Sequence, residues 1–402
     1  MDPASGQLSR RRFLEKTGQA TLAASLAGVA SSASAADAPD PPVKSDRKIR
    51  IGVVGGGFGC GFHWHEDPHC IVQAVSDLRT DRRDRLMKTY RCSTSYESLE
   101  KLILAKDIDA VAVFTGAPDH PAHCKAVMDT GKHCICAVPA AMDLDDCAML
   151  KETKERNKVT YMMAETSYYR QHTIAARKLF QDGAFGELFY SEVEYYHPSG
   201  EKERRRLHYY KDKRTWRYGF PPMLYPTHST GFLIGVTGER ITDISCLGWG
   251  NPEKASLKDN VYQNPFNAQA TMAKTNRGHM CRVNVFWDGC AHGERAQWFG
   301  TKLAYYMPGS GGQPFRLRGP GAPRWQRLPN FWHMVPRAMR RDSGHGGSHP
   351  FLTHEFIAAL AEGREPAVDI YESLAMTAPG IVAHASAFKG GEQMKVPCYD
   401  PA

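Results

Sequence analysis

The sequence predicts an α/β protein in two parts: an N-terminal doubly wound parallel sheet, then an α+β part with a large, open, mainly antiparallel sheet. Two observations predict this class. From residue 49 to residue 164, short apolar runs alternate with helical stretches, a spacing typical of βαβ units. Beyond residue 186, strand-like segments follow one another with few helices between them, which favours antiparallel pairing.

The first part begins with a β-branched run that ends in glycines. Four further apolar runs follow it, with helical stretches between them. We expect strands at 49–54, 71–76, 108–115, 133–137 and 159–164, and helices at 81–90, 121–130 and 143–157.

The second part is richer in strands. A stretch at 308–323 with many glycines and prolines is predicted to be a loop, and two helices are expected after it. We expect strands at 188–196, 241–247, 268–274, 279–286 and 296–299, and the C-terminal helices at 350–362 and 373–388.

Length and composition limit the function. A chain of 402 residues suggests two or three domains, and 42% apolar with 23% charged residues is the balance of a folded globular protein. The formal net charge of +8 is too small at this length to indicate nucleic-acid binding. No apolar run reaches the ~18 residues of a membrane span, so we expect a small-molecule partner, no nucleic acid and no membrane span.

Residues 1–35 have the three parts of an export signal in order: arginines before Phe13 and Leu14, a weakly apolar stretch at 21–30, and Ala-Ser-Ala at 33–35. The arginines resemble a twin-arginine signal, although Glu15 stands where that signal usually has lysine. We expect export by this route to a periplasmic or extracytoplasmic site. A basic amphipathic helix or a disordered basic tail is the alternative. Residues 36–46 are predicted to be a Pro-rich linker.

Eleven cysteines are many for an exported chain. Their number is odd and no Cys-x-x-Cys motif occurs. Because the twin-arginine system exports folded proteins, most thiols can stay free. We expect the sulfurs of Cys134 and Cys136 to face opposite sides of a strand, and we predict no metal site.

A glycine-rich loop directly follows the first expected strand, with Gly55, Gly57, Phe58 and Gly59 as candidate cofactor contacts. Glycines there permit a tight turn and a close backbone approach to a pyrophosphate, which the N-terminus of an expected following helix would face. The third glycine of the GxGxxG pattern is replaced by Cys60, and a glycine follows one residue later.

Asp77 closes the second expected strand, near the ~20-residue distance at which an acid binds ribose hydroxyls. Together with the loop it predicts a Rossmann domain that binds NAD, because a carboxylate repels the 2′-phosphate of NADP. Arg79 nearby leaves NADP open. The alternative is a Rossmann-like sheet without a cofactor.

Several strings then follow in an order known from one family: Thr115 and His120 after the third expected strand, Ala137-Val138-Pro139 after the fourth, and a Gly-Ala-Phe-Gly-Glu-Leu phrase at 183–188. They resemble the glucose–fructose oxidoreductase, inositol dehydrogenase and MocA family from about residue 47 to the end. The resemblance implies a Rossmann domain at 47–165, an α+β substrate domain at 166–402, and Thr115, His120 and Val138 beside the cofactor.

Two departures from that family are informative. The lysine that assists hydride transfer in the family is Val138 here, and the aspartate four residues before the second-domain histidine is Leu224. The strings Tyr-Pro-Thr-His at 225–228 and Gly-His-Gly-Gly at 344–347 resemble instead a branch of NAD-dependent glycosidases, whose type activity is α-N-acetylgalactosaminidase and which also has valine. By position, this resemblance implies active-site roles for Glu165, Tyr195 and His228. Tyr225 is a further candidate, because it flanks His228 and could orient the substrate.

The resemblance also implies a mechanism. In that branch a tightly held NAD takes a hydride from C3 of a sugar, the C2 proton is removed, the C1 substituent is eliminated, water adds and the hydride returns. Net redox change is zero, which suits an exported enzyme that cannot recycle soluble NADH.

The residues themselves support such chemistry. His228 is the best candidate for proton transfer, because imidazole titrates near pH ~6.5, and Tyr225 flanks it. Tyr195 could act as acid or base if a neighbouring cation lowers its pKa. Glu165 ends the last strand of the parallel sheet, where ligands of such sheets bind, and it could accept a hydrogen bond from a sugar hydroxyl or from the nicotinamide amide.

Each assignment has a structural alternative. His228 could cap a helix that begins near residue 229, Tyr195 could line a sheet surface, and Glu165 could pair with Arg170. His120 could cap the helix that follows it. His345 lies among glycines, in a site loop or in a plain turn.

Three functions stay open from the sequence. The first is a redox-neutral glycosidase with retained NAD, acting on a carbohydrate. The second is a conventional NAD(P)-dependent sugar or cyclitol dehydrogenase or oxidoreductase, and the third is a non-enzymatic NAD- or sugar-binding protein. The resemblance also implies a homo-oligomer, a dimer or tetramer, formed through the outer face of the open sheet.

Overall fold

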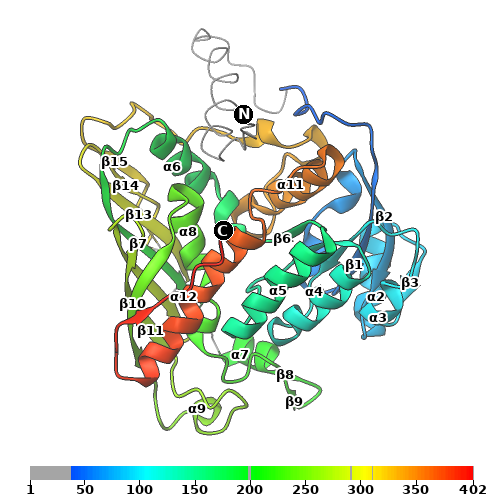
Figure 1. The fold of residues 1–402 in the computed structure, drawn as a ribbon, viewed down its shortest axis with the longest axis horizontal. Coiled ribbons are helices and arrows are strands. Elements are labelled where there is room, and N and C mark those ends of the chain that lie inside the picture. Colours follow the sequence, from blue (N-terminus) through cyan, green and yellow to red (C-terminus); the bar gives the residue numbers. More distant parts are fainter. Residues whose placement is uncertain (1–37, 198–200, 290–291, 310, 402) are drawn as a thin grey trace, which may run out of the picture.

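The computed structural model of the protein describes residues 38–197, 201–289, 292–309 and 311–401, with the backbone alone at 201–204. Two sheets lie on opposite sides of a group of helices (Figure 1). The expected export signal at 1–35 lies outside the described residues.

The first sheet has six parallel strands in the order β3-β2-β1-β4-β5-β6, as the sequence predicts for a doubly wound sheet. Strands β1 and β4 at its centre are buried almost throughout, because apolar residues occupy both of their faces. The order reverses between β1 and β4, and ligands of such sheets bind at the carboxyl ends of the strands at this point. The strands are β1 (Ile49–Val54), β2 (Cys70–Ser76), β3 (Ser95–Tyr96), β4 (Ala110–Val113), β5 (His133–Cys136) and β6 (Tyr161–Met163).

Helices connect these strands. Side chains cap two of them: Ser98 accepts a hydrogen bond from the Lys101 amide at 3.4 Å, and Asp143 accepts one from the Asp146 amide at 2.7 Å. The helices are α2 (Thr80–Tyr90), α3 (Leu99–Leu102), α4 (His120–Asp129) and α5 (Leu144–Asn157), with a short 3-10 turn η3 (Ala117–Asp119) before α4.

The helix expected after the glycine loop is absent from the described residues, so this prediction is wrong. Two 3-10 turns, η1 (Phe58–Gly61) and η2 (Trp64–Glu66), stand in its place. His63 between them has a φ of 54°, a left-handed conformation that ends a right-handed helix. Phe62 and Trp64 are fully buried, so the segment serves the core through these two rings rather than through a helical face.

The second sheet has eight strands in the order β15-β14-β13-β7-β12-β11-β10-β16. All pairs are antiparallel except β7 with β12, which are parallel. In β11 buried and exposed residues alternate, as expected when one face of a sheet packs on a core. The strands are β7 (Leu188–Tyr196), β10 (Ile241–Trp249), β11 (Ala268–Thr275), β12 (Met280–Phe286), β13 (Gly293–Gly300), β14 (Ala304–Tyr306), β15 (Arg316–Arg318) and β16 (Met394–Lys395); β8 (Tyr209–Tyr210) and β9 (Lys213–Arg214) form a separate hairpin.

Helices α8 and α12 cover the inner face of the second sheet (Figure 1). The sequence predicts few helices in this part: it misses α6, and it gives a helix near residue 229, where α8 lies, only as an alternative. The reason is clear for α8, since all eleven of its residues are buried and it has no polar face. The helices are α6 (Gln171–Gln181), α7 (Glu201–His208), α8 (Thr227–Thr237), α9 (Ala255–Lys258), α11 (His349–Glu362) and α12 (Ile370–Phe388), with short turns η4 (Thr166–Tyr169), η5 (Pro222–Leu224), η6 (Trp332–Met334), η7 (Arg337–Met339) and α10 (Gly344–Gly347).

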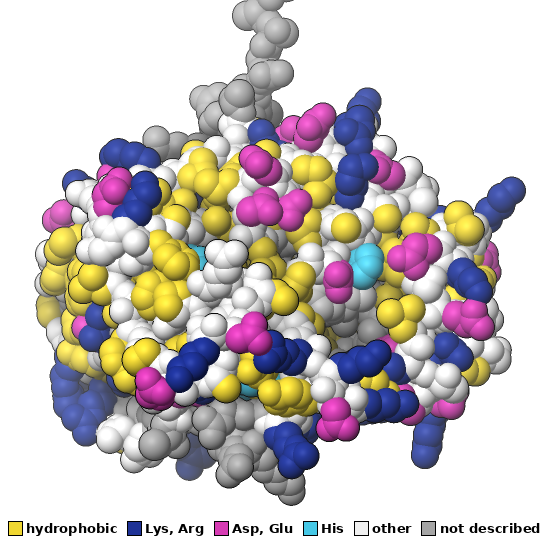
Figure 2. All heavy atoms as spheres, turned by 90° about the horizontal axis from the view of Figure 1, so that it is seen from below, with side chains coloured by type: hydrophobic (Ala, Val, Ile, Leu, Met, Phe, Trp, Pro, Cys, Tyr) yellow, Lys and Arg dark blue, Asp and Glu magenta, His cyan; other side chains and the backbone are white. Residues whose placement is uncertain are grey.

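The outer face of the second sheet carries exposed apolar side chains. They lie on β10, β11 and β12 and are between 47% and 64% exposed: Leu247, Trp249, Met272 and Met280. Large exposed apolar side chains on neighbouring strands favour a protein contact at this face. On the different face shown in Figure 2, Lys and Arg side chains are spread among Asp, Glu and apolar ones.

The described end of the expected linker is packed on the protein. The Arg340 guanidinium donates hydrogen bonds to the carbonyls of Ala38 and Pro39, and the Arg337 amide donates one to Asp40 at 2.6 Å. Among the described helices, none has the length and apolar character to cross a membrane.

Candidate active site

The four predicted active-site residues come together where the carboxyl ends of the first sheet meet α8. Glu165 follows β6, His228 is the second residue of α8, Tyr195 ends β7 on its inner face, and Tyr225 precedes α8. The His228 ring centre lies 4.7 Å from that of Tyr195 and 5.2 Å from that of Tyr225. All four side chains are buried.

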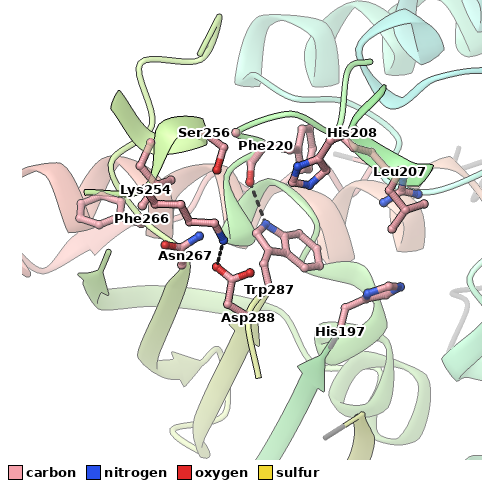
Figure 3. Close-up of a pocket in the computed structure, with 13 residues that line it drawn as sticks. His197, Leu207, His208, Phe220, Lys254, Ser256, Phe266, Asn267, Trp287 and Asp288 are labelled. Atoms are coloured by element: carbon pink, nitrogen blue, oxygen red, sulfur yellow. Dashed lines mark hydrogen bonds and ion pairs between the residues drawn. The ribbon is translucent and has the colours of Figure 1, made fainter. Parts of the chain in front are cut away.

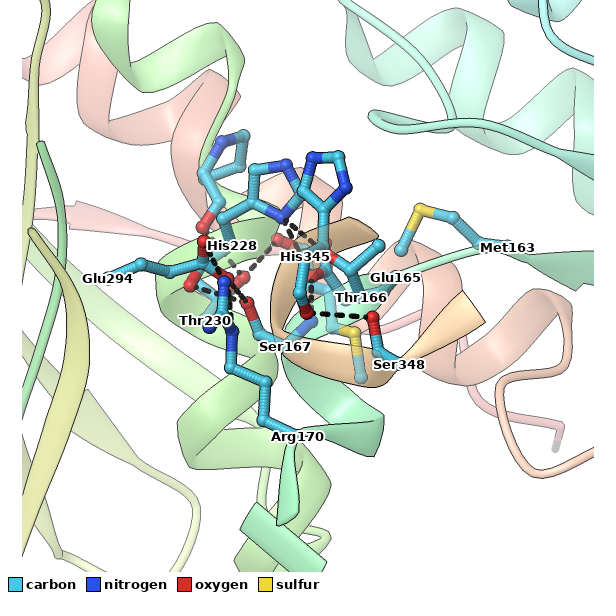
Figure 4. Close-up of polar contacts among 12 residues, drawn as sticks. Met163, Glu165, Thr166, Ser167, Arg170, His228, Thr230, Glu294, His345 and Ser348 are labelled. Carbon is cyan, nitrogen blue, oxygen red and sulfur yellow. Dashed lines mark hydrogen bonds and ion pairs between the residues drawn. The ribbon is translucent and has the colours of Figure 1, made fainter. Parts of the chain in front are cut away.

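Glu165 and His228 form a buried pair (Figure 4). The Nδ1 of His228 donates to Glu165 Oε1 at 2.9 Å, and the same oxygen accepts the amide of Ser167 at 2.7 Å. Gly231, one turn further along α8, makes this possible, because a Cβ there would lie 2.9 Å from Glu165 Cγ. The pair leaves the Nε2 of His228 without a hydrogen-bond partner among the described residues.

The environment of His228 raises the pKa of its imidazole. Burial lowers the pKa of His228, but the charge and hydrogen bond of Glu165, with the charge of Glu294, outweigh burial and leave the pKa raised. The capping alternative is wrong, since His228 lies inside α8 and the residue at the cap position, Pro226, has no side-chain capping bond. An imidazole held in this way can give or take a proton at Nε2.

The alternative interpretation from the sequence, in which Glu165 pairs with Arg170, is also wrong. Arg170 binds Glu294, with its Nε donating to Oε1 at 2.7 Å. The Ser167 hydroxyl lies 2.9 Å both from Glu294 Oε1 and from the His228 carbonyl. Glu294 on β13 is thus a second buried carboxylate of the site. The sequence analysis missed it, because no motif marks residue 294.

Neither Tyr195 nor Tyr225 has the lowered pKa that the sequence suggested for Tyr195. Burial raises the pKa of Tyr195 and of Tyr225, and the Arg217 charge lowers each of them by less. Arg217 is the neighbouring cation that the expectation required: its guanidinium carbon lies 5.5 Å from the centre of the Tyr225 ring and 4.2 Å from that of Trp216. Both phenols therefore stay neutral near pH 7 and can donate hydrogen bonds, so Tyr195 does not have the lowered pKa that base chemistry needs.

An aromatic pocket adjoins Tyr195 and Tyr225 (Figure 3). Trp287 forms part of its wall, 6.1 Å from the Tyr195 ring centre and 5.8 Å from that of Tyr225. The Trp287 indole donates to the Phe220 carbonyl at 2.7 Å, and Lys254 forms an ion pair with Asp288 across the pocket. Other lining residues are His197, His208, Arg217, Ser256 and Asn267.

The glycine loop has the shape of a phosphate cradle. Gly55 has a φ of +101°, and a Cβ there would lie 2.1 Å from the carbonyl oxygen of Phe114. Gly57 instead faces open space, where the nearest atoms to an added Cβ belong to Arg82 at 3.8 Å. A backbone without side chains thus borders an open edge, which is what a pyrophosphate needs.

Two other loop residues face inward. A Cβ on Gly59 would meet the Phe114 ring at 2.9 Å. The Phe58 ring packs against Phe62, Phe114 and His345, with centres 5.0, 5.5 and 5.3 Å away. Gly59 and Phe58 therefore fix the shape of the loop by packing on the side that faces the protein interior.

Asp77 directly follows β2 and lies beside this loop. Its carboxylate accepts the Gly56 amide at 2.7 Å and the Arg79 amide at 2.8 Å, which leaves further lone pairs for ribose hydroxyls. Arg79 is engaged elsewhere: its Nε donates to Asp81 at 3.0 Å, and its guanidinium lies 3.8 Å from the ring centre of Tyr210. With Arg79 neutralised by an acid, the site favours NAD over the more negative NADP.

Thr115 and Val138 lie at the carboxyl ends of β4 and β5, at the edge of the expected cofactor crevice. His120 lies beneath it. Its ring nitrogens lie 2.7 Å from the Pro139 carbonyl and 3.3 Å from the Thr115 carbonyl, so His120 supports these two loops instead of capping α4. Burial lowers the pKa of His120, but the Cys136 sulfur and the two carbonyls outweigh it and raise the pKa.

The expectation for the cysteines is wrong in one respect. Cys134 and Cys136 are two residues apart on β5, so their side chains share a face, and both contact Cys124 on α4. Burial and these thiols raise the pKa of Cys124 well above its usual range. The described residues contain no cluster of three or more His, Cys, Asp or Glu side chains arranged to hold a metal ion.

The residues present fit a bound NAD. Besides the cradle and the ribose acid, three buried polar atoms at this edge have no hydrogen-bond partner among the described residues: Ser76 Oγ, Glu165 Oε2 and Thr227 Oγ1. Buried polar groups are almost always paired.

Comparison with known proteins gives a family match for the first part of the chain and relatives along most of its length. Residues 49–165 match the Gfo/Idh/MocA model, described as an oxidoreductase family with an NAD-binding Rossmann fold. The chain is 25% identical to a glycosyl hydrolase family 109 protein of Solibacter usitatus over 97% of each sequence. It is 23% identical to a protein of the same description from Streptomyces coelicolor, over 89% of this chain and 84% of that one.

Solved structures share the fold. The WlbA dehydrogenase of Bordetella pertussis, in complex with NADH and UDP-GlcNAcA, matches with a TM-score of 0.70 at 16% identity, over 88% of this chain and 99% of that one. The aldose-aldose oxidoreductase of Caulobacter crescentus matches with a TM-score of 0.69 at 17% identity, over 87% and 100%. The protein is thus an NAD-dependent enzyme whose residues 49–165 match the NAD-binding Rossmann fold of the Gfo/Idh/MocA oxidoreductase family.

Proposed function

We propose that the protein is a glycosidase that retains its NAD and cleaves a glycosidic bond without net oxidation or reduction. The observation that carries the proposal is the buried Glu165–His228 pair, with Nδ1 and Oε1 2.9 Å apart, at a site where Val138 replaces the lysine of ordinary dehydrogenases. The relatives described as glycosyl hydrolase family 109 proteins support the same reading.

His228 is the group that moves the proton. Glu165 holds Nδ1–H, so Nε2 is the nitrogen that accepts a proton from the substrate and later returns it. The negative charges of Glu165 and Glu294 stabilise the imidazolium formed on the way. When bound, NAD supplies reversible hydride acceptance at a sugar carbon, which makes the proton on the neighbouring carbon acidic.

The surrounding residues bind and orient the sugar. Tyr195 and Tyr225 are neutral phenols that donate hydrogen bonds to its hydroxyls, and Arg217 between Trp216 and Tyr225 donates others. Trp287 and Phe220 line the adjoining pocket, beside Tyr225. Burial of the pair excludes bulk water from the proton transfer.

The test begins with the protein as purified. NAD released by denaturation is quantified, and the protein is then screened with chromogenic glycosides in D2O without added cofactor. We expect about one NAD per chain, release of the chromophore without NADH accumulation, and deuterium at C2 of the product. The matched control is His228→Ala, which should keep its NAD and lose turnover.

Two outcomes would reject the proposal. Steady NADH production from free sugars with added NAD would identify a conventional dehydrogenase. Absence of bound nucleotide and of turnover on every substrate would identify a binding protein.

We also propose that the protein is exported by the twin-arginine route, on the strength of the sequence at 1–35. Fractionation of cells that express the full chain tests this. Arg11→Lys with Arg12→Lys should abolish appearance of the protein in the periplasm, and Arg10→Lys is the control that leaves the pair intact.

A further inference from the structure

A chain of three imidazoles links the candidate active site to the glycine loop. The His228 ring stacks on that of His345, with centres 6.1 Å apart and planes at 26°. His345 Nδ1 lies 3.0 Å from His349 Nε2, and His349 Nδ1 lies 2.9 Å from the carbonyl oxygen of Gly61. The sequence analysis gave His349 no role.

The carbonyl at the end of this chain determines the protons along it. A carbonyl oxygen only accepts, so His349 Nδ1 carries a hydrogen. In a neutral His349 ring, Nε2 then has a lone pair, and His345 Nδ1 must donate to it. His345 Nε2 is therefore left with its own lone pair, and no described residue hydrogen-bonds to it.

The ring of His349 is held firmly in the orientation that this requires. It stacks on Phe62, with centres 4.5 Å apart and planes at 8°, and Phe58 meets it edge-on at 5.4 Å. Glycines leave room for it on two sides: a Cβ on Gly61 would lie 2.9 Å from its Nδ1, and a Cβ on Gly344 2.8 Å from its Cε1. This accounts for the glycine at 61, one residue after the usual third glycine of the loop.

His345 itself is held in an unfavourable backbone conformation. Its φ of 56° is left-handed, which costs a residue with a side chain roughly 1–2 kcal/mol. The residue stays exposed although its ring is packed against neighbours. The surrounding contacts thus keep an imidazole at a position where glycine would be easier to accommodate.

We propose that His349 is a positioning residue: anchored on the Gly61 carbonyl, it fixes His345 in the tautomer with hydrogen on Nδ1 and presents an unprotonated Nε2 beside His228. The inference rests on the proposed function only in treating the space beside His228 as the place of the substrate. The contact of His349 with the Gly61 carbonyl connects the glycine loop to the loop at 344–347, which carries His345.

The charges around the two rings support this state. Burial lowers the pKa of His349 to about 4, with the His63 charge acting in the same direction. Burial of its ring lowers the pKa of His345 to about 3, the charges of His228, His349 and Arg170 act in the same direction, and Glu294 opposes them. Both rings are neutral near pH 7, as the chain of donors requires.

The experiment reads the tautomers by ¹⁵N NMR of histidine-labelled protein, with whatever nucleotide it carries on purification. We expect neutral rings with hydrogen on Nδ1 at both His345 and His349, assigned by single substitutions. Hydrogen on Nε2 of either ring, or a charged ring at neutral pH, would overturn the proposal. This readout needs no turnover, so failure of the proposed glycosidase function leaves it intact.

Two variants separate positioning from mere folding. His349→Gln keeps an acceptor near the place of Nε2, and His349→Asn keeps only a donor near Gly61. We expect His349→Gln to retain the His345 tautomer and kcat within about twofold. His349→Asn should lose the tautomer and lower kcat by about tenfold or more, with equal NAD content in both. An unchanged His345 tautomer in His349→Asn would refute the role of His349.

Discussion

Replacement of Glu165 by Gln tests the central pair by removing its charge alone. Oε1 of Glu165 accepts two hydrogen bonds, from the Ser167 amide at 2.7 Å and from His228 Nδ1 at 2.9 Å. Because both partners donate, the amide of Gln must place its oxygen there and its NH2 at Oε2. The tautomer of His228 is thus kept while the negative charge is lost.

The magnitude follows from the kinds of hydrogen bond involved. A bond to a charged group contributes ~1.5–3 kcal/mol and a neutral one ~0.5–1.5, so the pair weakens by roughly 1–1.5 kcal/mol, or about one pKa unit at His228. We expect the pKa of His228 to fall and kcat to drop by about tenfold. In the variant the NH2 group takes the place of Oε2, which has no hydrogen-bond partner among the described residues. Because this buried donor finds no acceptor, it costs a further ~1–3 kcal/mol of stability.

The assay is the pH dependence of kcat together with urea unfolding at several pH values. In the plot of kcat against pH, the transition that reflects titration of His228 should move to lower pH by about one unit. In the wild type the raised pKa of His228 stabilises the fold fully below its ordinary value of 6.5, and this contribution is lost as pH rises through the raised value. The stability gap between Glu165→Gln and wild type should therefore be larger near pH ~6 than near pH ~9. An unmoved transition with a gap independent of pH would refute the reasoning.

Three further predictions follow from other parts of the fold. Gly55→Ala should purify without NAD and with a lower Tm, because its Cβ would lie 2.1 Å from a carbonyl oxygen; Gly131→Ala, also at positive φ but with nothing within 4 Å, should keep NAD. Arg170→Met should cost about 3–5 kcal/mol in urea unfolding, since it leaves a buried carboxylate unpaired; a cost below about 1 kcal/mol would contradict the ion pair. Trp249→Lys should shift an oligomer toward monomer in light scattering, whereas Val261→Lys, an exposed site elsewhere, should not; a monomeric wild type would exclude this contact.

The sequence reveals the first sheet well because its strands are buried on both faces. Ala110–Val113 is apolar throughout and Ile49–Val54 is apolar except for Arg50, and glycine or helical patterns separate such runs. The same rule hides α8, whose residues from Thr227 to Thr237 are all buried and therefore show no helical periodicity. A segment enclosed on every side has no polar face to reveal its period.

The site is less accessible to sequence reasoning because its contacts join distant residues. Glu165 and His228 are 63 positions apart and meet only when α8 packs against the end of β6. Local adjacency suggests Arg170 as the partner of Glu165, but the turn at Thr166–Tyr169 directs Arg170 to a strand of the other sheet. A resemblance to known motifs found His228, whereas Glu294 carries no motif and becomes visible only in three dimensions.

Helix α12 has a consequence for how substrate enters. It packs against β6 and α5 on one side and against β10 on the other, and the backbone amide of Met163 bonds to the Val368 carbonyl just before it at 3.1 Å. Rotation of one sheet away from the other would break these contacts of α12. Substrate must therefore reach the buried imidazole while α12 and the two sheets keep their places.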